Sequence, residues 1–143
     1  MGPQRFSPSE IAEILRSRRQ HRRGPPEAIF ADEVEVRHMT GTCAPTRLSG
    51  GQLAASLDAE QEAFRAAMAD FQMIDQRYVV GSDSIAQTMA LSGTLPDGER
   101  LFVPICAVYR LEDGRIAAID AYMDSVLEAK YVALVRAHAP AAR

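Results

Sequence analysis

The sequence predicts an α+β fold in which an antiparallel sheet curls around one face that is covered by helices. Two observations support this prediction. Apolar residues recur at helical spacing near both ends and in the first half of the chain, whereas residues 71–124 show the alternation of strands. Within that region, short polar segments have the Asp-Gly type of composition that closes β-hairpins. A chain of 143 residues has the length of one domain, which we expect to span residues 1–143.

The first helix is predicted to begin after Ser7. Ser7 can cap the helix, Pro8 suits the first helical position, and Glu10 completes a capping box. The helix should end before Gly24, because two prolines follow that glycine. Its buried face is predicted to be the apolar stripe of Ile11, Ile14 and Leu15.

Six arginines precede Gly24, and most of them lie at the end of this helix. Cations at the C-terminal end of a helix interact favourably with the helix dipole. We therefore interpret the cluster as a solvated helix end, and binding of a phosphate or an acidic carrier protein is the alternative. The cluster consists of Arg16, Arg18, Arg19, Arg22 and Arg23.

The middle of the chain is predicted to hold a strand and a second helix. Alternation over Ile29–His38 indicates a strand, and helical spacing over Gln52–Ala69 indicates a helix. A segment rich in Gly, Thr, Pro and Ser, residues 40–51, separates them. Four further strands and a terminal helix follow, the last three strands as sequential antiparallel hairpins. Their predicted ranges are Phe71–Val80, Ser84–Leu95, Arg100–Leu111, Arg115–Asp124 and Ser125–Ala137.

Composition excludes several classes of protein. A net charge of −3 argues against a dedicated nucleic-acid binder, and no apolar run reaches the ~18 residues of a membrane span. Cys43 and Cys106 are too few for a disulfide framework or a zinc cluster, and the three histidines are scattered. There is no P-loop and no dinucleotide fingerprint. We therefore expect a cytoplasmic protein without a metal or cofactor.

The last predicted strand carries polar residues in an alternating row. Asp120, Tyr122 and Asp124 share one face of it, opposite an apolar face. A buried carboxylate without partners is costly, so the row either faces solvent or lines a cavity. In an apolar cavity a carboxyl group has a raised pKa and can act as a general acid or base. The alternative is an exposed face on which Asp124 caps the following helix.

His38 ends the strand face that also carries Val34 and Val36. It can point into the same cavity, where a neutral imidazole suits proton transfer. The alternative is a hydrogen-bonded residue at the rim of the sheet.

Residues 93–98, 108–116 and 122–124 (Gly-Thr…Gly, Val-Tyr-Arg-Leu-Glu-Asp-Gly-Arg-Ile and Tyr-Met-Asp) resemble the C-terminal half of nuclear transport factor 2-like domains. Phe30-Ala31-Asp32-Glu33-Val34 resembles the first strand of that fold. Within the superfamily, the chain is most similar to SnoaL-like polyketide cyclases and the limonene epoxide hydrolase group. The resemblance implies a cone-shaped curved sheet around helices, a deep apolar pocket and a homodimer through the sheet.

The resemblance also bears on the site. It implies that Asp124 points into the pocket as acid or base, with Tyr122 and Asp120 at inward positions. Limonene-type hydrolases carry arginine and aspartate where this chain has Gln87 and Met89, so their paired-carboxylate mechanism is not available here. His38 stands where ketosteroid isomerases have their catalytic carboxylate.

These observations together predict a small pocket enzyme without a cofactor. It would use general acid–base catalysis on an apolar, oxygenated ligand of polyketide, steroid or terpenoid type, by cyclisation, isomerisation, dehydration or epoxide opening. Asp124 and His38 are the predicted catalytic residues, and Tyr122, Asp120, Gln87 and Met89 the predicted substrate-binding residues. The alternative is a non-catalytic ligand-binding or dimerisation module of the same fold.

Overall fold

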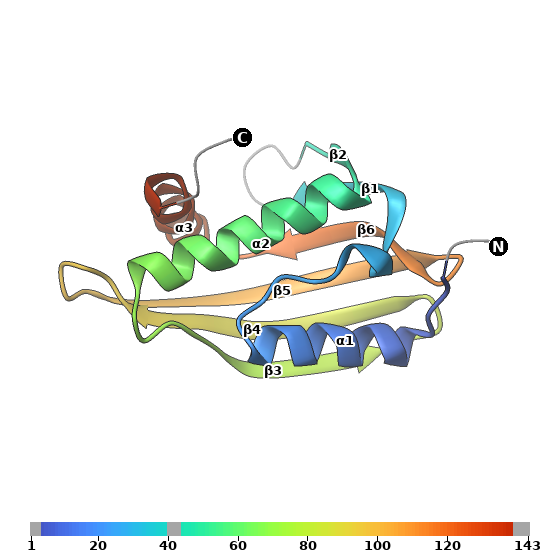
Figure 1. Ribbon diagram of the computed structural model, residues 1–143, viewed down its shortest axis with the longest axis horizontal. Helices are drawn as coiled ribbons and strands as arrows, with labels where there is room; N and C mark the ends of the chain where they lie inside the picture. The colour runs from blue at the N-terminus through green and yellow to red at the C-terminus, as the bar shows by residue number, and fades with distance from the viewer. Residues whose placement is uncertain (1–3, 40–43, 139–143) are drawn as a thin grey trace.

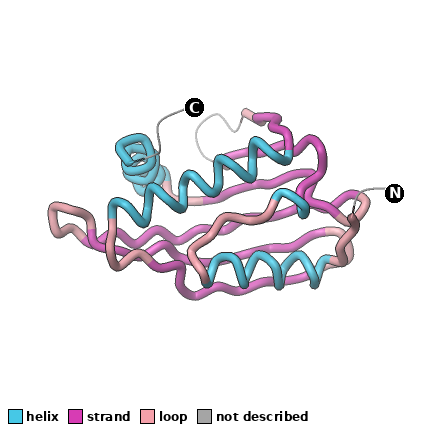
Figure 2. Tube along the Cα trace, viewed as in Figure 1, coloured by secondary structure: helices cyan, strands magenta, loops and turns pink. Residues whose placement is uncertain are grey.

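The computed structural model describes residues 4–39 and 44–138, and Cys43 lies outside them. Figure 1 shows one curved sheet with α1 and α2 on the same face and α3 beside the end of α2. Figure 2 shows that the long strands form a continuous layer beneath these helices. The elements are α1 (Pro8–Gln20), the 3-10 helix η1 (Glu27–Ile29), β1 (Phe30–His38), β2 (Thr46–Ser49), α2 (Gly50–Ala67), β3 (Gln72–Val80), β4 (Ser84–Thr94), β5 (Arg100–Glu112), β6 (Arg115–Tyr122) and α3 (Ser125–His138). The predicted α+β class is confirmed.

The six strands form one sheet in the order β2-β1-β6-β5-β4-β3. Strands β3 to β6 pair antiparallel in sequence, which confirms the predicted hairpins. Strand β1 pairs parallel to β6, with His38 opposite Ala121. This pairing brings the end of β1 beside the end of β6, although more than eighty residues separate them in sequence.

The capping signals at the starts of α1 and α2 are satisfied. The Ser7 hydroxyl accepts from the backbone N–H of Glu10, and the Glu10 carboxylate accepts from that of Ser7. Helix α2 begins with the same arrangement, formed by Ser49 and Gln52. Helix α2 begins at Gly50, two residues before the predicted start near Gln52, and neither this cap nor β2 was predicted. Strand β2 has four residues and pairs with β1 alone, so it has little pattern of its own.

The register of the strand pairs shifts at three places in the sheet. The shifts lie between Phe30 and Glu35 in the β1–β6 pair, between Ile74 and Arg77 in the β3–β4 pair, and between Arg110 and Leu111 in the β5–β6 pair. In the second, Asp75 has φ 56°, in the left-handed region that a short polar side chain tolerates better than a branched one. Such bulges increase local twist, which lets the sheet curve around the helices.

The core consists of two apolar clusters along the inner face of the sheet. The first joins α1, the start of α2 and the middle strands, and the second joins the end of α2 to β3, β4, β5 and α3. In the second cluster, Phe64 stacks on Phe71 with ring centroids 5.1 Å apart and contacts Tyr131 at 5.0 Å. These rings hold the end of α2 against both the sheet and α3.

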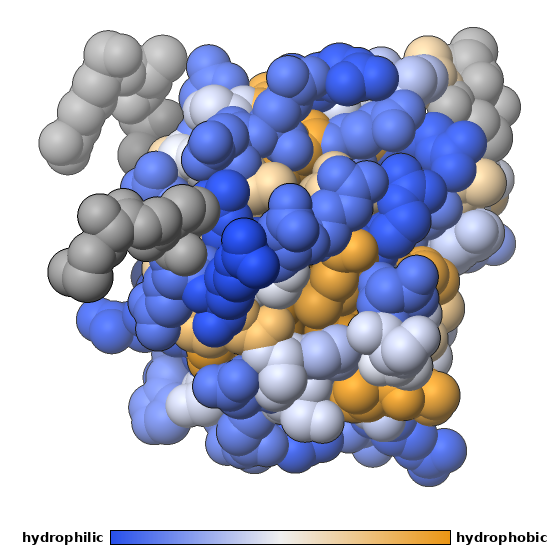
Figure 3. Space-filling view, turned by 90° about the vertical axis from the view of Figure 1, so that its right-hand side faces the viewer, coloured by the Kyte–Doolittle hydropathy of each residue, from blue (hydrophilic) through white to orange (hydrophobic). Residues whose placement is uncertain are grey.

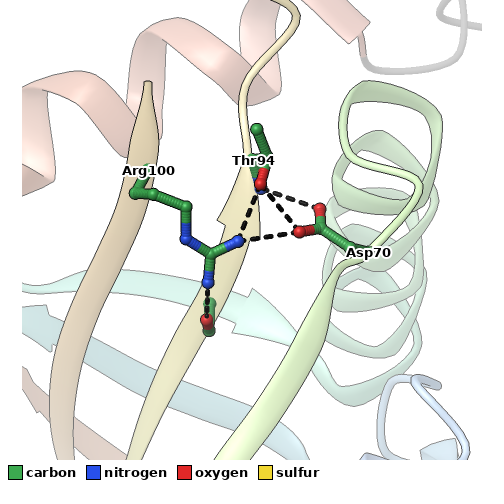
Figure 4. Close-up of polar contacts among 4 residues, drawn as sticks. Asp70, Thr94 and Arg100 are labelled. Atoms are coloured by element: carbon green, nitrogen blue, oxygen red, sulfur yellow. Dashed lines mark hydrogen bonds and ion pairs between the residues drawn. The ribbon is translucent and has the colours of Figure 1, made fainter. Parts of the chain in front are cut away.

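An exposed polar network fastens the turn after α2 to the β4–β5 hairpin (Figure 4). Asp70 accepts from the backbone N–H of Thr94 at 2.7 Å, from its hydroxyl at 2.8 Å and from Arg100 at 2.7 Å. The hydrogen bonds from Thr94 are the main reason that the pKa of Asp70 lies below its ordinary value. The network therefore stabilises the folded state at pH values above the ordinary pKa of an aspartate. This stabilisation is lost as the pH falls through the lowered pKa of Asp70.

Figure 3 shows the end of the molecule that lies at the right of Figure 1. Hydrophilic residues cover most of this end, and apolar residues emerge between them in separate patches. None of the helices in the described part of the chain is both long and apolar enough to cross a membrane.

Candidate functional site

A cavity of about 170 Å³ lies between the inner face of the sheet and the three helices. Its wall is mostly apolar, and polar side chains from α1, α2, α3 and the strands converge on it. An apolar wall with a small number of polar groups is typical of a site that binds a small molecule. The polar residues of the wall and one methionine beside them determine the chemistry of the cavity; they are Arg19, His38, Glu60, Gln61, Gln87, Met89, Tyr109 and Tyr131.

Glu60 of α2 is the carboxyl group on this wall. Tyr131 of α3 donates a hydrogen bond to its Oε2 at 2.6 Å. Burial raises the pKa of Glu60 above its ordinary value, and the bond from Tyr131 and the charges of Arg19 and His38 offset part of that rise. Burial, with the nearby Glu60 carboxylate, also raises the pKa of Tyr131 well above its ordinary value. Glu60 is therefore a carboxyl group suited to accept or release a proton nearer neutral pH.

Arg19 of α1 points into the fold rather than into solvent, with only 7% of the residue exposed. Its Nη1 donates a weak hydrogen bond to the Met73 sulfur at 3.9 Å. Burial raises the pKa of Tyr109, and the charge and hydrogen bond of Arg19 offset part of that rise. The Nε of Arg19 has no hydrogen-bond partner. The interpretation of the arginine cluster as a solvated helix end is therefore wrong for this residue.

A second polar group on the wall also lacks a partner. Gln61 follows Glu60 on α2 and is 1% exposed, and its Oε1 accepts no hydrogen bond from the described residues. A buried acceptor left unpaired costs roughly 1–3 kcal/mol. The site therefore offers one unused donor, at Arg19, and one unused acceptor.

Gln87 belongs to a chain of hydrogen bonds across the strands. Tyr109 donates to its Oε1 at 2.6 Å, and its Nε2 donates to the hydroxyl of Tyr78 at 2.9 Å and to the Met89 sulfur at 3.6 Å. Burial raises the pKa of Tyr78 to about 12 and also raises that of Tyr109, so both hydroxyls stay protonated. Gln87 and Met89 line the cavity as expected, but the Gln87 amide is already engaged and fixes the position of Tyr109.

His38 lies at the mouth of the cavity, where β1 ends. Its side chain is 60% exposed, and its Nδ1 lies 4.0 Å from the Glu128 carboxylate of α3. His38 therefore borders the cavity and also lies at the rim of the sheet, so each of its two interpretations is right in part.

The structure places Asp120, Tyr122 and Asp124 away from the described wall of this cavity, and the expected inward placement is corrected. The β6 residues on the wall come from the opposite face, Ile119 and Ala121. Asp120 forms an ion pair with Arg37 at 3.0 Å, and Tyr122 is 41% exposed. The alternative interpretation of Asp124 holds: its Oδ1 accepts from the backbone N–H groups of the first turn of α3 at 2.9 and 3.1 Å.

The sequence contained a signal for the residues that were missed. Arg19 continues the apolar stripe of α1 four residues after Leu15. Glu60 and Gln61 lie three and four residues after Leu57, on the side of α2 that also carries Phe64. Polar residues on the apolar stripe of a helix indicate a buried polar site, and this pattern was not used.

A larger groove of about 590 Å³ lies at the surface between η1, β1 and the start of α2. It is open to solvent. Its charged residues are Glu27, Asp32 and Arg115, and the last two form an ion pair at 3.2 Å. The groove therefore lacks the unpaired buried groups of the interior cavity. In the described ranges, no group of three or more His, Cys, Asp or Glu side chains is placed to hold a metal ion.

The curved sheet, the helices on its inner face and the enclosed cavity define a protein of the nuclear transport factor 2-like class. Sequence comparison specifies the family: the model of the SnoaL-like domain matches residues 22–119, and the chain belongs to this family. No curated protein matches the sequence.

Solved structures share the fold at low sequence identity. A protein of unknown function with a cystatin-like fold from Xanthomonas campestris is 19% identical, with a TM-score of 0.64 over 88% of this chain and 98% of its own. A proposed isomerase from Bacillus subtilis is 10% identical, with a TM-score of 0.58 over 86% and 92% of the two chains. A proposed SnoaL-like polyketide cyclase from Jannaschia sp. CCS1 is 13% identical, with a TM-score of 0.54 over 73% of each chain.

Proposed function

We propose that the protein is an acid–base enzyme that binds a small, mostly apolar, oxygenated molecule in the interior cavity and isomerises or cyclises it by proton transfer. The observation that carries the proposal is Glu60, a carboxyl group with a raised pKa on an apolar wall, held by Tyr131 at 2.6 Å. The SnoaL-like family includes cyclases and isomerases, which agrees with such a reaction.

Each polar group has a role in this proposal. Glu60 removes a proton from a carbon next to a carbonyl and returns it at a second position, so no oxidant or reductant is needed. Tyr131 holds the Glu60 carboxylate in place. The charge of Arg19, which is buried and has no partner at its Nε, stabilises the negative charge that develops on the carbonyl oxygen. His38 stands at the mouth, where it can exchange protons with solvent.

Hydrogen exchange tests this function without knowledge of the natural substrate. A panel of small ketones and oxo acids is incubated with the protein in deuterated water, and loss of C–H signals is followed by NMR. We expect deuterium incorporation above the buffer rate for at least one compound. An Ala121→Leu variant, which fills the cavity from β6, should abolish it, and Ala86→Leu on β4, outside the described wall, should not. Exchange at the buffer rate across the panel would contradict the proposal.

The second candidate function is a non-catalytic binding or dimerisation module. The observation that favours it is apolar exposure: Phe102 is 50% and Tyr122 41% exposed. A shallow pocket is formed in part by Tyr122 and the half-buried Cys106. An apolar surface of this kind is suited to pairing with a second copy.

A homodimer through this surface remains a prediction. We expect the mass measured by light scattering to be that of a dimer. Phe102→Glu should shift the protein towards monomer because it places a charge in an apolar contact, whereas Val79→Glu, at the far edge strand β3, should not. A wild-type mass of one chain would contradict this prediction.

A further inference from the structure

We infer that the cavity binds a monocarboxylate with an apolar body, whose carboxylate contacts Arg19. This inference rests on the proposed function and specifies its ligand. The first observation is the state of Arg19, which is permanently charged and 7% exposed, and whose Nε has no partner. Its direct partners among the described residues are a thioether and a phenol, neither of which is an anion at neutral pH.

A buried guanidinium needs an anion, because its charge is costly away from water unless it is paired and hydrogen-bonded. Glu60 acts on Arg19 through its charge, but Arg19 is in none of the ion pairs between described residues. Since burial raises the pKa of Glu60, this carboxyl group is a poor permanent counter-ion. A ligand carboxylate would supply the missing anion.

The second, independent observation is the unpaired Oε1 of Gln61, which is 1% exposed. An acceptor at this position requires a donor on the ligand, such as a hydroxyl group or an enol. Arg19 and Gln61 come from different helices and both line the cavity. A molecule that carries both a carboxylate and a hydroxyl or enol group would satisfy both orphaned atoms at once.

The charge and size of the cavity restrict the anion. Arg19 is the single arginine or lysine on the described wall, and the Glu60 carboxyl group lies on the same wall. A phosphate dianion would need more cations than this, so a singly charged carboxylate fits better. The volume of about 170 Å³ suits a body the size of one ring, since apolar cavities of roughly 150 Å³ accept benzene.

The test compares benzoate with its neutral analogue benzamide by isothermal titration calorimetry. The full-length wild-type protein should bind benzoate about 10- to 100-fold more tightly, the range expected for hydrogen bonds to a charged group. Arg19→Met should remove this preference and bind benzamide as the wild type does. Arg23→Met, which changes an exposed arginine of the same cluster, should leave the preference intact.

Stability supplies a second readout that a merely structural arginine would not give. Without ligand, Arg19→Met should unfold at the same urea concentration as the wild type or at a higher one, because an unpaired buried charge is removed. A lower midpoint would show that the fold needs Arg19 and would contradict the inference.

Equal wild-type affinities for benzoate and benzamide, or no binding of either, would overturn the carboxylate proposal. Equal affinities would leave the proposed acid–base function standing, since that function requires a ligand but not an anion. Conversely, failure of the exchange assay with a retained preference for benzoate would overturn the enzyme and keep the binding site. The two proposals can therefore fail separately.

Discussion

Replacing Glu60 by glutamine is expected to lower the rate of hydrogen exchange in a bound compound by about 10²–10⁴-fold, the usual contribution of a general acid or base. The amide keeps the shape of the carboxyl group and can still bond to Tyr131, but it cannot accept a proton from carbon. Glu62→Gln is the matched control, because Glu62 is exposed on the same helix. An E60Q rate within threefold of wild type would remove Glu60 from the mechanism.

Replacing Asp124 by asparagine distinguishes the two candidates for the acid–base group, Glu60 and Asp124. In the structure Asp124 caps α3, so Asp124→Asn should keep the exchange rate, and Asp124→Ala should cost about 0.5–2 kcal/mol of stability. If the rate fell by 10²-fold in Asp124→Asn and not in Glu60→Gln, the prediction from the strand pattern would be right and the assignment from the cavity wrong.

The pH dependence follows from the raised pKa of Glu60. As a base, Glu60 acts when ionised, so the wild-type rate should rise with pH through an apparent pKa above the ordinary 4.5. The groups that face it are Tyr131 of α3, Arg19 of α1 and His38 of β1. In the E60Q variant this rising limb should disappear, which rate measurements across pH 4–8 would show.

Linkage gives the matching effect on stability. The folded state holds the Glu60 proton more tightly than the unfolded state, so the associated stability is fully present below the unfolded pKa. It is lost as the pH rises through the folded pKa. The melting temperature of E60Q should therefore fall less than that of the wild type over this interval.

Replacing Phe64 by alanine is expected to lower the free energy of unfolding by about 3–5 kcal/mol. Phe64 is 1% exposed and packs between Phe71 and Tyr131, so the substitution leaves a void that the sheet, α2 and α3 cannot all close. Domains of this size are stable by only about 5–15 kcal/mol, so the loss is a large share of the total. Urea unfolding monitored by circular dichroism measures it.

Val79→Ala is the control for this substitution, because Val79 is 71% exposed on the edge strand β3. We expect a loss below about 1 kcal/mol there, as for surface substitutions in general. A loss below about 1.5 kcal/mol for Phe64→Ala would mean that the site collapses around the void. In that case the contacts of the Phe64 ring with Phe71 and Tyr131 would not be what holds α3 in place beside the cavity.

The sequence was most informative where a pattern is local. The Ser7–Glu10 capping box, the helical stripes and the Asp-Gly turns depend on residues within a few positions of one another, and the structure has the corresponding helices and hairpins. Strand β2 was missed because four residues acquire strand character only by pairing with β1. The family resemblance agreed with the fold because both depend on the same order of elements.

The site was harder to predict, because alternation along β6 identifies two faces but not which one is inside. Asp120 and Asp124 were assigned inward, whereas Asp120 pairs with Arg37 and Asp124 caps α3. Gln87 and Met89 lie on the cavity wall because β4 is packed on its inner face along its length. Their roles in binding remain predictions.

The sequence by itself thus determined the helices, the hairpins and the α+β class, since these follow from spacing, capping and turn residues. The tertiary structure alone decided the chemistry of the cavity. Arg19, Glu60 and Tyr131 belong to three different helices, and they meet on one wall only after α1, α2 and α3 have packed on the sheet. The burial that raises the pKa of Glu60 and leaves Arg19 without an anion is a property of that packing.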